Sequence, residues 1–187
     1  MEYRSRFYIS KTIVNNHDYL IKFCEDFHKV HQETIKGSST WTYKHYNFFN
    51  FMYPTHVLWS LLEELKSFVH SYLEEHNEPT DNVWMASWLN FHMPDEVLDW
   101  HTHLEVKFHG YMSIRPHNTR TLFFENDEVG NNEVGMVYIG PGDNFHKVEV
   151  IEPFDTPRIT VAFDIVNGNE EYQGIERGYG IHFIPLV

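Results

Sequence analysis

The chain has 187 residues, of which 42% are hydrophobic and 17% aromatic, and this composition excludes an intrinsically disordered protein. Its 14 basic and 27 acidic side chains give a formal net charge of −13 at pH 7, which argues against a nucleic-acid polymer or an anionic membrane as partner. Cys24 is the one cysteine, and the chain shows neither a signal-peptide pattern nor an apolar run of membrane-spanning length. We therefore expect a cytoplasmic protein.

The first third of the chain has helical periodicity. Apolar residues recur at helical spacing in a segment that Asn15 or Asn16 can cap and Gly37 can end. A second helix is expected to begin near Pro54, because proline is favoured in a first turn, and to run to about His76. Two helices therefore precede the rest of the fold.

From residue 82 the chain breaks into short β-like runs separated by turn residues. The runs are VWMASWLNF, LEVKFHGYMSI, TRTLFFE, VGMVYI, HKVEVI, RITVAFDI and GIHFIPL. Strands at this spacing favour a mainly β fold, here a double-stranded β-helix (a cupin-like jelly roll) supported by the two helices. We expect a single domain over residues 1–187, with a helical part at about 1–80 and a jelly-roll part at about 82–187.

Among 14 histidines, a closely spaced pair indicates metal chemistry. His101 and His103 would share one face of a strand, and His146 can add a third ligand from another strand. A mononuclear iron site for oxygen chemistry needs three such ligands on one side of the metal. Two alternatives stay open at this point. The pair can belong to a solvated polar face, or His103 can pair with Glu105 to give a histidine–carboxylate set.

An arginine lies twelve residues beyond His146, in the apolar run RITVAFDI. Burying Arg158 is costly without an anionic partner, and its planar fork suits a carboxylate. The hydroxyl of Thr160 would point the same way and add a donor. The alternative is a structural salt bridge with one of the many acidic side chains.

Taken together, these motifs resemble the 2-oxoglutarate/Fe(II)-dependent oxygenases, in particular their compact bacterial and phage group with a prolyl-hydroxylase-like jelly roll. The resemblance covers roughly residues 84–166. It rests on Trp88-Leu-Asn90, His101-Thr-His103, Gly110-Tyr111, Gly135-Met-Val-Tyr-Ile, Pro141, His146 and Pro157-Arg158-Ile-Thr160. If the chain is phage-encoded, its compartment would be the host cytoplasm.

The resemblance implies that His101, His103 and His146 bind Fe(II), with Arg158 and Thr160 holding the distal carboxylate of 2-oxoglutarate. It also implies an O2-dependent oxygenase, a hydroxylase of an unidentified substrate, that releases succinate and CO2. Three histidines replace the usual two histidines and one carboxylate, and this departure gives the metal a more positive environment.

Further residues are candidates for contacts around this site. Tyr111 and Ser113 share a face of the following strand and are candidates for binding 2-oxoglutarate. Asn90, His109 and Trp100 are weaker candidates for contacting the substrate. The aromatic walls expected around the site are Trp88, Trp100, Phe108 and Phe123.

Two other classes of protein compete with this interpretation. One is a three-histidine cupin-like metalloenzyme that does not use 2-oxoglutarate, in which nothing requires Arg158. The other is a non-catalytic jelly-roll interaction module, in which the histidines are incidental. Metal binding distinguishes the module from both enzymes, and the role of Arg158 distinguishes the two enzymes.

Overall fold

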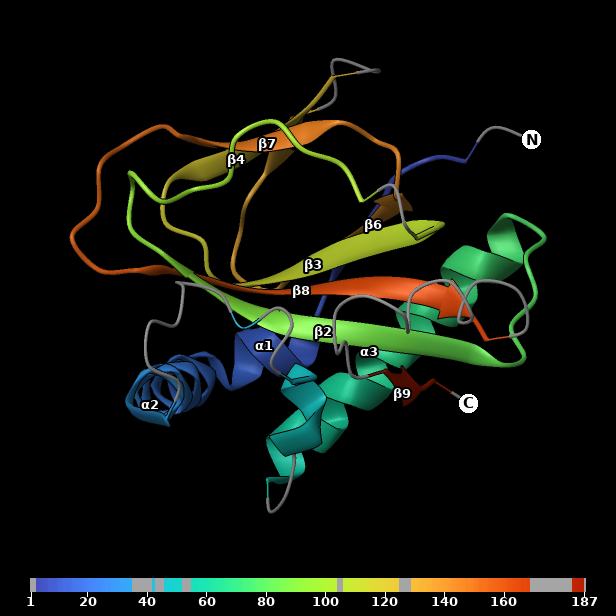
Figure 1. Cartoon of the computed structure of the whole chain (residues 1–187), viewed down its shortest axis with the longest axis horizontal. Coiled ribbons are helices and arrows are strands. Elements are labelled where there is room, and N and C mark those ends of the chain that lie inside the picture. The colour runs from blue at the N-terminus through green and yellow to red at the C-terminus, as the bar shows by residue number, and fades with distance from the viewer. Residues whose placement is uncertain are drawn as a thin grey trace.

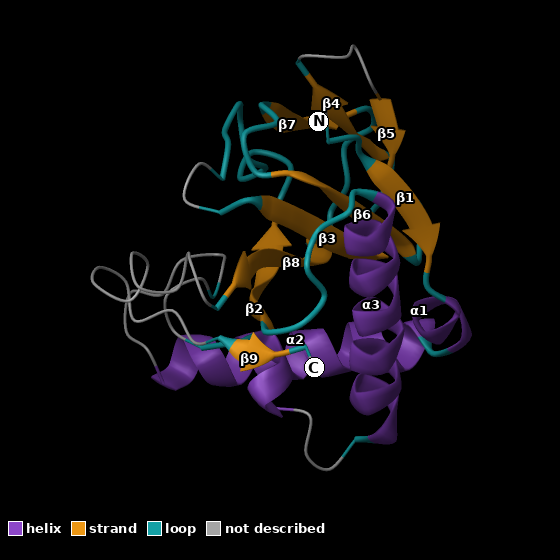
Figure 2. Cartoon of the chain, turned by 90° about the vertical axis from the view of Figure 1, so that its right-hand side faces the viewer, coloured by secondary structure: helices purple, strands orange, loops and turns teal. Residues whose placement is uncertain are grey.

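The computed structural model describes residues 3–34, 42, 46–51, 55–103, 106–124, 129–168 and 183–186. Figures 1 and 2 show three layers: a small sheet, a larger sheet below it, and helices covering the face of the larger sheet that points away from the small one. The candidate site lies between the two sheets, as shown below.

The helices are α1 (Lys11–Asn15), α2 (His17–Thr34) and α3 (His56–Glu75), with a short 3-10 turn at Phe48–Phe51. The two predicted helices are confirmed as α2 and α3, and the expected end at Gly37 lies outside the described residues. The separate helix α1 was not predicted. Ser10 caps it by accepting a hydrogen bond from the backbone N–H of Ile13. No described helix is long and apolar enough to cross a bilayer.

The larger sheet has the strand order β1-β6-β3-β8-β2-β9, and its neighbouring strands are antiparallel. Its strands are β1 (Arg6–Ile9), β2 (Val83–His92), β3 (Phe108–Arg115), β6 (Met136–Pro141), β8 (Arg158–Asn167) and β9 (Ile184–Pro185). The small sheet has the order β5-β4-β7 and is also antiparallel. Its strands are β4 (Thr119–Phe123), β5 (Val129–Asn131) and β7 (His146–Val150).

A mainly β fold with antiparallel sheets and supporting helices is therefore confirmed, whereas closure into a double-stranded β-helix stays a prediction. Two strands were not expected. β1 lies in the part of the sequence interpreted as helical, and β5 lies in a stretch interpreted as a break. Both are short edge strands, β1 beside β6 and β5 beside β4.

Strand β8 is central in the larger sheet and is buried along almost its whole length. Its odd-numbered residues join the main core with the helices: Ile159, Val161, Phe163 and Ile165. Its even-numbered residues face the small sheet: Arg158, Thr160, Ala162 and Asp164. A strand with both faces buried reads as a nearly continuous apolar run, so each polar residue within it needs a partner.

The space between the sheets holds a second, smaller core. Its members are Trp88, Tyr111, Phe123, Met136, Tyr138 and Ala162. Three of them, Trp88, Tyr111 and Ala162, also line a cavity together with polar side chains of β2 and β8.

Candidate metal centre

Three histidines come together at the edge of the inter-sheet space. The possible ligand atoms of His101, His103 and His146 lie within 4.8 Å of one another. His146 begins β7, and His101 forms an isolated antiparallel bridge with it through backbone hydrogen bonds of 2.9 and 3.0 Å. The backbone N–H of His103 donates to Gly142 O at 2.7 Å. The pair thus lies on an extended segment before β3 and not within a long strand as expected.

Every one of the three imidazoles has its Nδ1 engaged. Nδ1 of His101 donates to Asp99 O at 2.7 Å, Nδ1 of His146 donates to Asn144 O at 2.7 Å, and Nδ1 of His103 donates to Asp164 Oδ1 at 2.8 Å. Metal-binding histidines usually donate the ring N–H that does not face the metal in this manner. The arrangement leaves the lone pair of Nε2 on each ring available to a common metal ion.

Burial favours the neutral form of two of these imidazoles, those of His101 and His146. Burial lowers the pKa of His146 to about 3, and a charge on the neighbouring His101 would lower it further. Burial also lowers the pKa of His101, although the hydrogen bond to Asp99 O opposes this shift. Because protons compete poorly for these nitrogens, the lone pairs remain available to a metal at neutral pH.

This donor set fits a divalent transition metal. Imidazole nitrogen suits iron, copper, nickel and zinc, and three ligands on one side leave positions for exogenous molecules. Glu105, the alternative partner of His103, lies outside the described residues. The choice between His101 and Glu105 as a ligand therefore stays a prediction, which a variant described in the Discussion tests.

A cavity of about 70 Å³ extends from the histidines between the sheets. This volume exceeds the roughly 10–15 Å³ that a single water requires. Strand β2 lines it with Trp88, Asn90 and His92, and β8 lines it with Arg158, Thr160 and Ala162. The cavity therefore joins the predicted metal ligands to the predicted carboxylate-binding residues.

Arg158 is the most unusual side chain of this cavity. It is 4% exposed, and within the described part of the chain no carboxylate pairs with it. Its Nη1 donates a long hydrogen bond of 3.4 Å to Thr160 Oγ1, and its Nε has no partner among the described residues. Burial lowers the pKa of Arg158 to about 10, an effect that nearby Tyr111 opposes. The structural salt bridge considered from the sequence is thus not found in the described structure.

The neighbours of Arg158 add hydrogen-bonding capacity. Thr160 Oγ1 accepts from Arg158 and, at 3.3 Å, from Asn90 Nδ2, so the Thr160 hydroxyl proton remains free to donate into the cavity. Tyr111 also lines the cavity, but its hydroxyl already contacts Thr121 Oγ1 at 2.8 Å and Asn132 Oδ1 at 3.0 Å. Tyr111 therefore serves as a wall whose single phenolic proton is committed within the protein.

Several other candidates from the sequence lie away from the cavity. Ser113 is fully buried and does not line it. His109 is buried behind the ligands, with its ring 4.3 Å from that of His103 and 4.7 Å from that of His146. Trp100 does not line the cavity, and its ring stacks on that of Phe145 with the centroids 5.2 Å apart.

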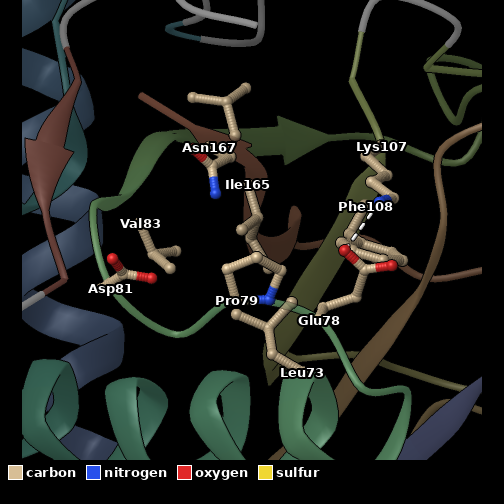
Figure 3. Close-up of a pocket in the computed structure, with 10 residues that line it drawn as sticks. Leu73, Glu78, Pro79, Asp81, Val83, Lys107, Phe108, Ile165 and Asn167 are labelled. Carbon is tan, nitrogen blue, oxygen red and sulfur yellow. Dashed lines mark hydrogen bonds and ion pairs between the residues drawn. The ribbon is translucent and has the colours of Figure 1, made fainter. Parts of the chain in front are cut away.

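Of the remaining expected walls, Trp88 lines the cavity and Phe123 packs in the small core, 5.7 Å from the ring of His146. Phe108 faces the helices instead and lines a second, larger cavity of about 310 Å³, shown in Figure 3. There Glu78 accepts hydrogen bonds from Lys107 Nζ and from Tyr3, each at 2.6 Å. These charged groups are satisfied by one another.

Two residues of the site were not predicted from the sequence. His92 lines the cavity beside Arg158, its register partner across β2 and β8, and burial together with that guanidinium lowers its pKa to about 4. His92 alternates with Trp88 and Asn90 along β2, and this spacing could have indicated that the three residues share one face. Asp164, the partner of His103, had a weaker signal: an acidic residue in an otherwise apolar strand.

Comparisons with known proteins do not assign the chain to a family. No protein-family model matches the chain, and no curated protein matches it. Among solved structures, a gentisate complex of a mutant salicylate 1,2-dioxygenase from Pseudoaminobacter salicylatoxidans has 8% sequence identity and a TM-score of 0.36. The match covers 66% of this chain and 35% of that dioxygenase, so the chain spans about a third of its length. A similarity of this size identifies neither a family nor an activity.

Proposed function

We propose that this protein is a non-haem Fe(II) oxygenase that uses O2 and 2-oxoglutarate to hydroxylate an unidentified substrate. The observation that carries the proposal is the buried guanidinium of Arg158, which has no anionic partner among the described residues and lines the same cavity as three histidines suited to a metal. A buried cation is costly unless an anion compensates it, so a bound carboxylate is the natural counterpart.

Each residue then has a defined task. His101, His103 and His146 would hold Fe(II), which supplies O2 activation coupled to decarboxylation of the keto acid. Arg158 would bind the distal carboxylate through charge-assisted hydrogen bonds, and the Thr160 hydroxyl would donate a further one. The apolar walls around Trp88 and Ala162 exclude water from the reacting groups.

The size of the cavity limits the molecules that it can bind. A cavity of about 70 Å³ is too small for a nucleotide or a peptide side chain in addition to a keto acid. We infer that the organic substrate approaches the metal from the open side of the site. The cavity therefore selects the co-substrate, and the surface around the histidines selects the substrate.

A second candidate is a three-histidine dioxygenase that cleaves its own carboxylate-bearing substrate without 2-oxoglutarate. It is favoured by the ligand set itself, which contains no carboxylate among the described residues. Nothing in this class of enzyme requires Arg158, although its guanidinium would be available here to a carboxylate of the substrate. Both candidates need the metal, and they differ in whether 2-oxoglutarate is consumed and in whether Arg158 is required.

The experiment that tests the proposal follows O2-dependent conversion of 2-oxoglutarate to succinate by the iron-loaded protein. Wild type is expected to form succinate slowly even without a primary substrate, and Arg158→Met to bind 2-oxoglutarate at least about 30-fold more weakly. This factor corresponds to about 2 kcal/mol, the lower range for removing one partner of a buried charge pair. Arg158→Met should stay folded, because it replaces an unpaired buried cation by an apolar side chain.

Arg120→Met is the matched control. Arg120 forms its ion pair with Glu149 at 2.5 Å on the half-exposed small sheet, away from the cavity. It should form succinate at the rate of wild type. Succinate formation that survives Arg158→Met unchanged would exclude the proposed role of the arginine, and an absence of succinate with bound iron would favour the second candidate.

A further inference from the structure

The described ligand set of the metal site contains three neutral imidazoles and no carboxylate. A dication held by neutral ligands alone keeps its full charge within a largely buried site, which is unfavourable without compensating negative charge nearby. Among the described residues, Asp164 is the one whose carboxylate contacts the side chain of a ligand directly.

Asp164 lies in β8, with Phe163 and Ile165 on either side. Its side chain is 7% exposed, and its register partners are His109 on β3 and Ala86 on β2, so it lies on the inner face of a central strand. Burying a carboxylate there is costly without a partner. The partner that the described structure provides is His103, whose Nδ1 lies 2.8 Å from Asp164 Oδ1.

The three ligands differ in this respect. His101 and His146 are oriented by backbone carbonyls, of Asp99 and Asn144, which carry only partial charge. His103 alone of the three donates to a carboxylate. An acceptor of full charge polarises the ring, fixes the proton on Nδ1 and makes Nε2 a stronger donor to a metal.

We propose that Asp164 is a positioning residue that supplies the negative charge of this metal centre from behind His103. It holds His103 in the tautomer with the proton on Nδ1, directs Nε2 toward the metal, and raises the affinity of the site for a dication. This inference rests on the proposed metal site. It does not depend on whether 2-oxoglutarate or another carboxylate is bound.

The test uses two substitutions that separate charge from orientation. In Asp164→Asn the amide oxygen can still accept from Nδ1 while the charge is lost, and in Asp164→Leu both are lost. Ser87→Ala is the matched control, because Ser87 is buried on the neighbouring strand β2 and bonds Asn47 Oδ1 at 2.6 Å on the helix side of the sheet. Mn(II) affinity of each full-length protein is measured by titration, and the tautomer of His103 by 15N NMR without metal.

We expect Asp164→Asn to bind Mn(II) about 10- to 100-fold more weakly than wild type while keeping the Nδ1–H tautomer. Asp164→Leu should weaken binding further and also lose the tautomer preference, whereas Ser87→Ala should match wild type. Wild-type affinity in both Asp164 variants would show that Asp164 is only structural, as would an Nε2–H tautomer in wild type. A wild type that binds no Mn(II) would instead overturn the proposed function, and this inference with it.

Discussion

Replacing His101 by alanine is expected to abolish the thermal stabilisation that Mn(II) gives the metal-free wild type. A ligand present at 100 times its Kd stabilises a protein by about 2.7 kcal/mol. For a chain of this size that corresponds to a rise in Tm of about 5–10 °C, which the variant should lack. His101 is suited to this test because it is half-buried and its side chain makes one hydrogen bond, to Asp99 O. Thermal denaturation with and without Mn(II) measures the difference.

Two control variants make the result specific. His56 lies exposed on α3 and bonds Ser60, so His56→Ala should keep the full stabilisation. Glu105→Ala should keep it as well if His101 is the ligand. Stabilisation lost in Glu105→Ala but kept in His101→Ala would instead establish the His103–Glu105 pair as the ligand set.

Acidification is expected to destabilise the metal-free protein already at pH values well above those at which most carboxyl groups titrate. Burial lowers the pKa of His92 to about 4 and that of His146 to about 3, and holds the pKa of His109 far below its ordinary value. In the unfolded chain all three regain a pKa of about 6.5, so the unfolded state binds more protons between these values. The unfolding free energy must then fall as the pH falls.

The expected size of this effect is about 1.2 kcal/mol for each histidine, or about 3–4 kcal/mol for the three, between about pH 7 and about pH 5.5. Urea denaturation in the presence of a chelator measures it. The variant His92→Gln should lose about a third of the pH dependence, whatever its stability at neutral pH. Equal unfolding free energies at the two pH values would contradict neutral burial of these histidines.

The main helices and most strands were predictable from the sequence because their patterns are local. The helical spacing of apolar residues in α3 indicates a helix, and the apolar runs of β2 and β8 indicate buried strands, without reference to any distant residue. Strands β1 and β5 were missed because short edge strands form through pairing with their neighbours, β6 and β4, and not through a pattern of their own. The start of α2 directly after Asn16 agrees with the helix start predicted at Asn15 or Asn16, whereas the short helix α1 before it was missed.

For the site, the recognisable motifs indicated His101, His103, His146 and Arg158, and the fold brings all four to one cavity. What the sequence could not supply is which side chains from distant strands meet these residues. Asp164 lies 61 residues from His103, and their contact depends on how β8 sits behind the histidine segment. Trp100 does not line the cavity, and its contact with a substrate stays a prediction.

The most direct test of the central claim is an anaerobic titration of the Fe(II)-loaded wild-type protein with 2-oxoglutarate, followed by visible absorption. A site that combines three histidines with Arg158 predicts the weak charge-transfer band of a keto acid chelated to iron, with the band absent in Arg158→Met. Bound iron without any band in wild type would contradict the use of 2-oxoglutarate, and failure of the protein to bind iron would contradict the metal centre itself.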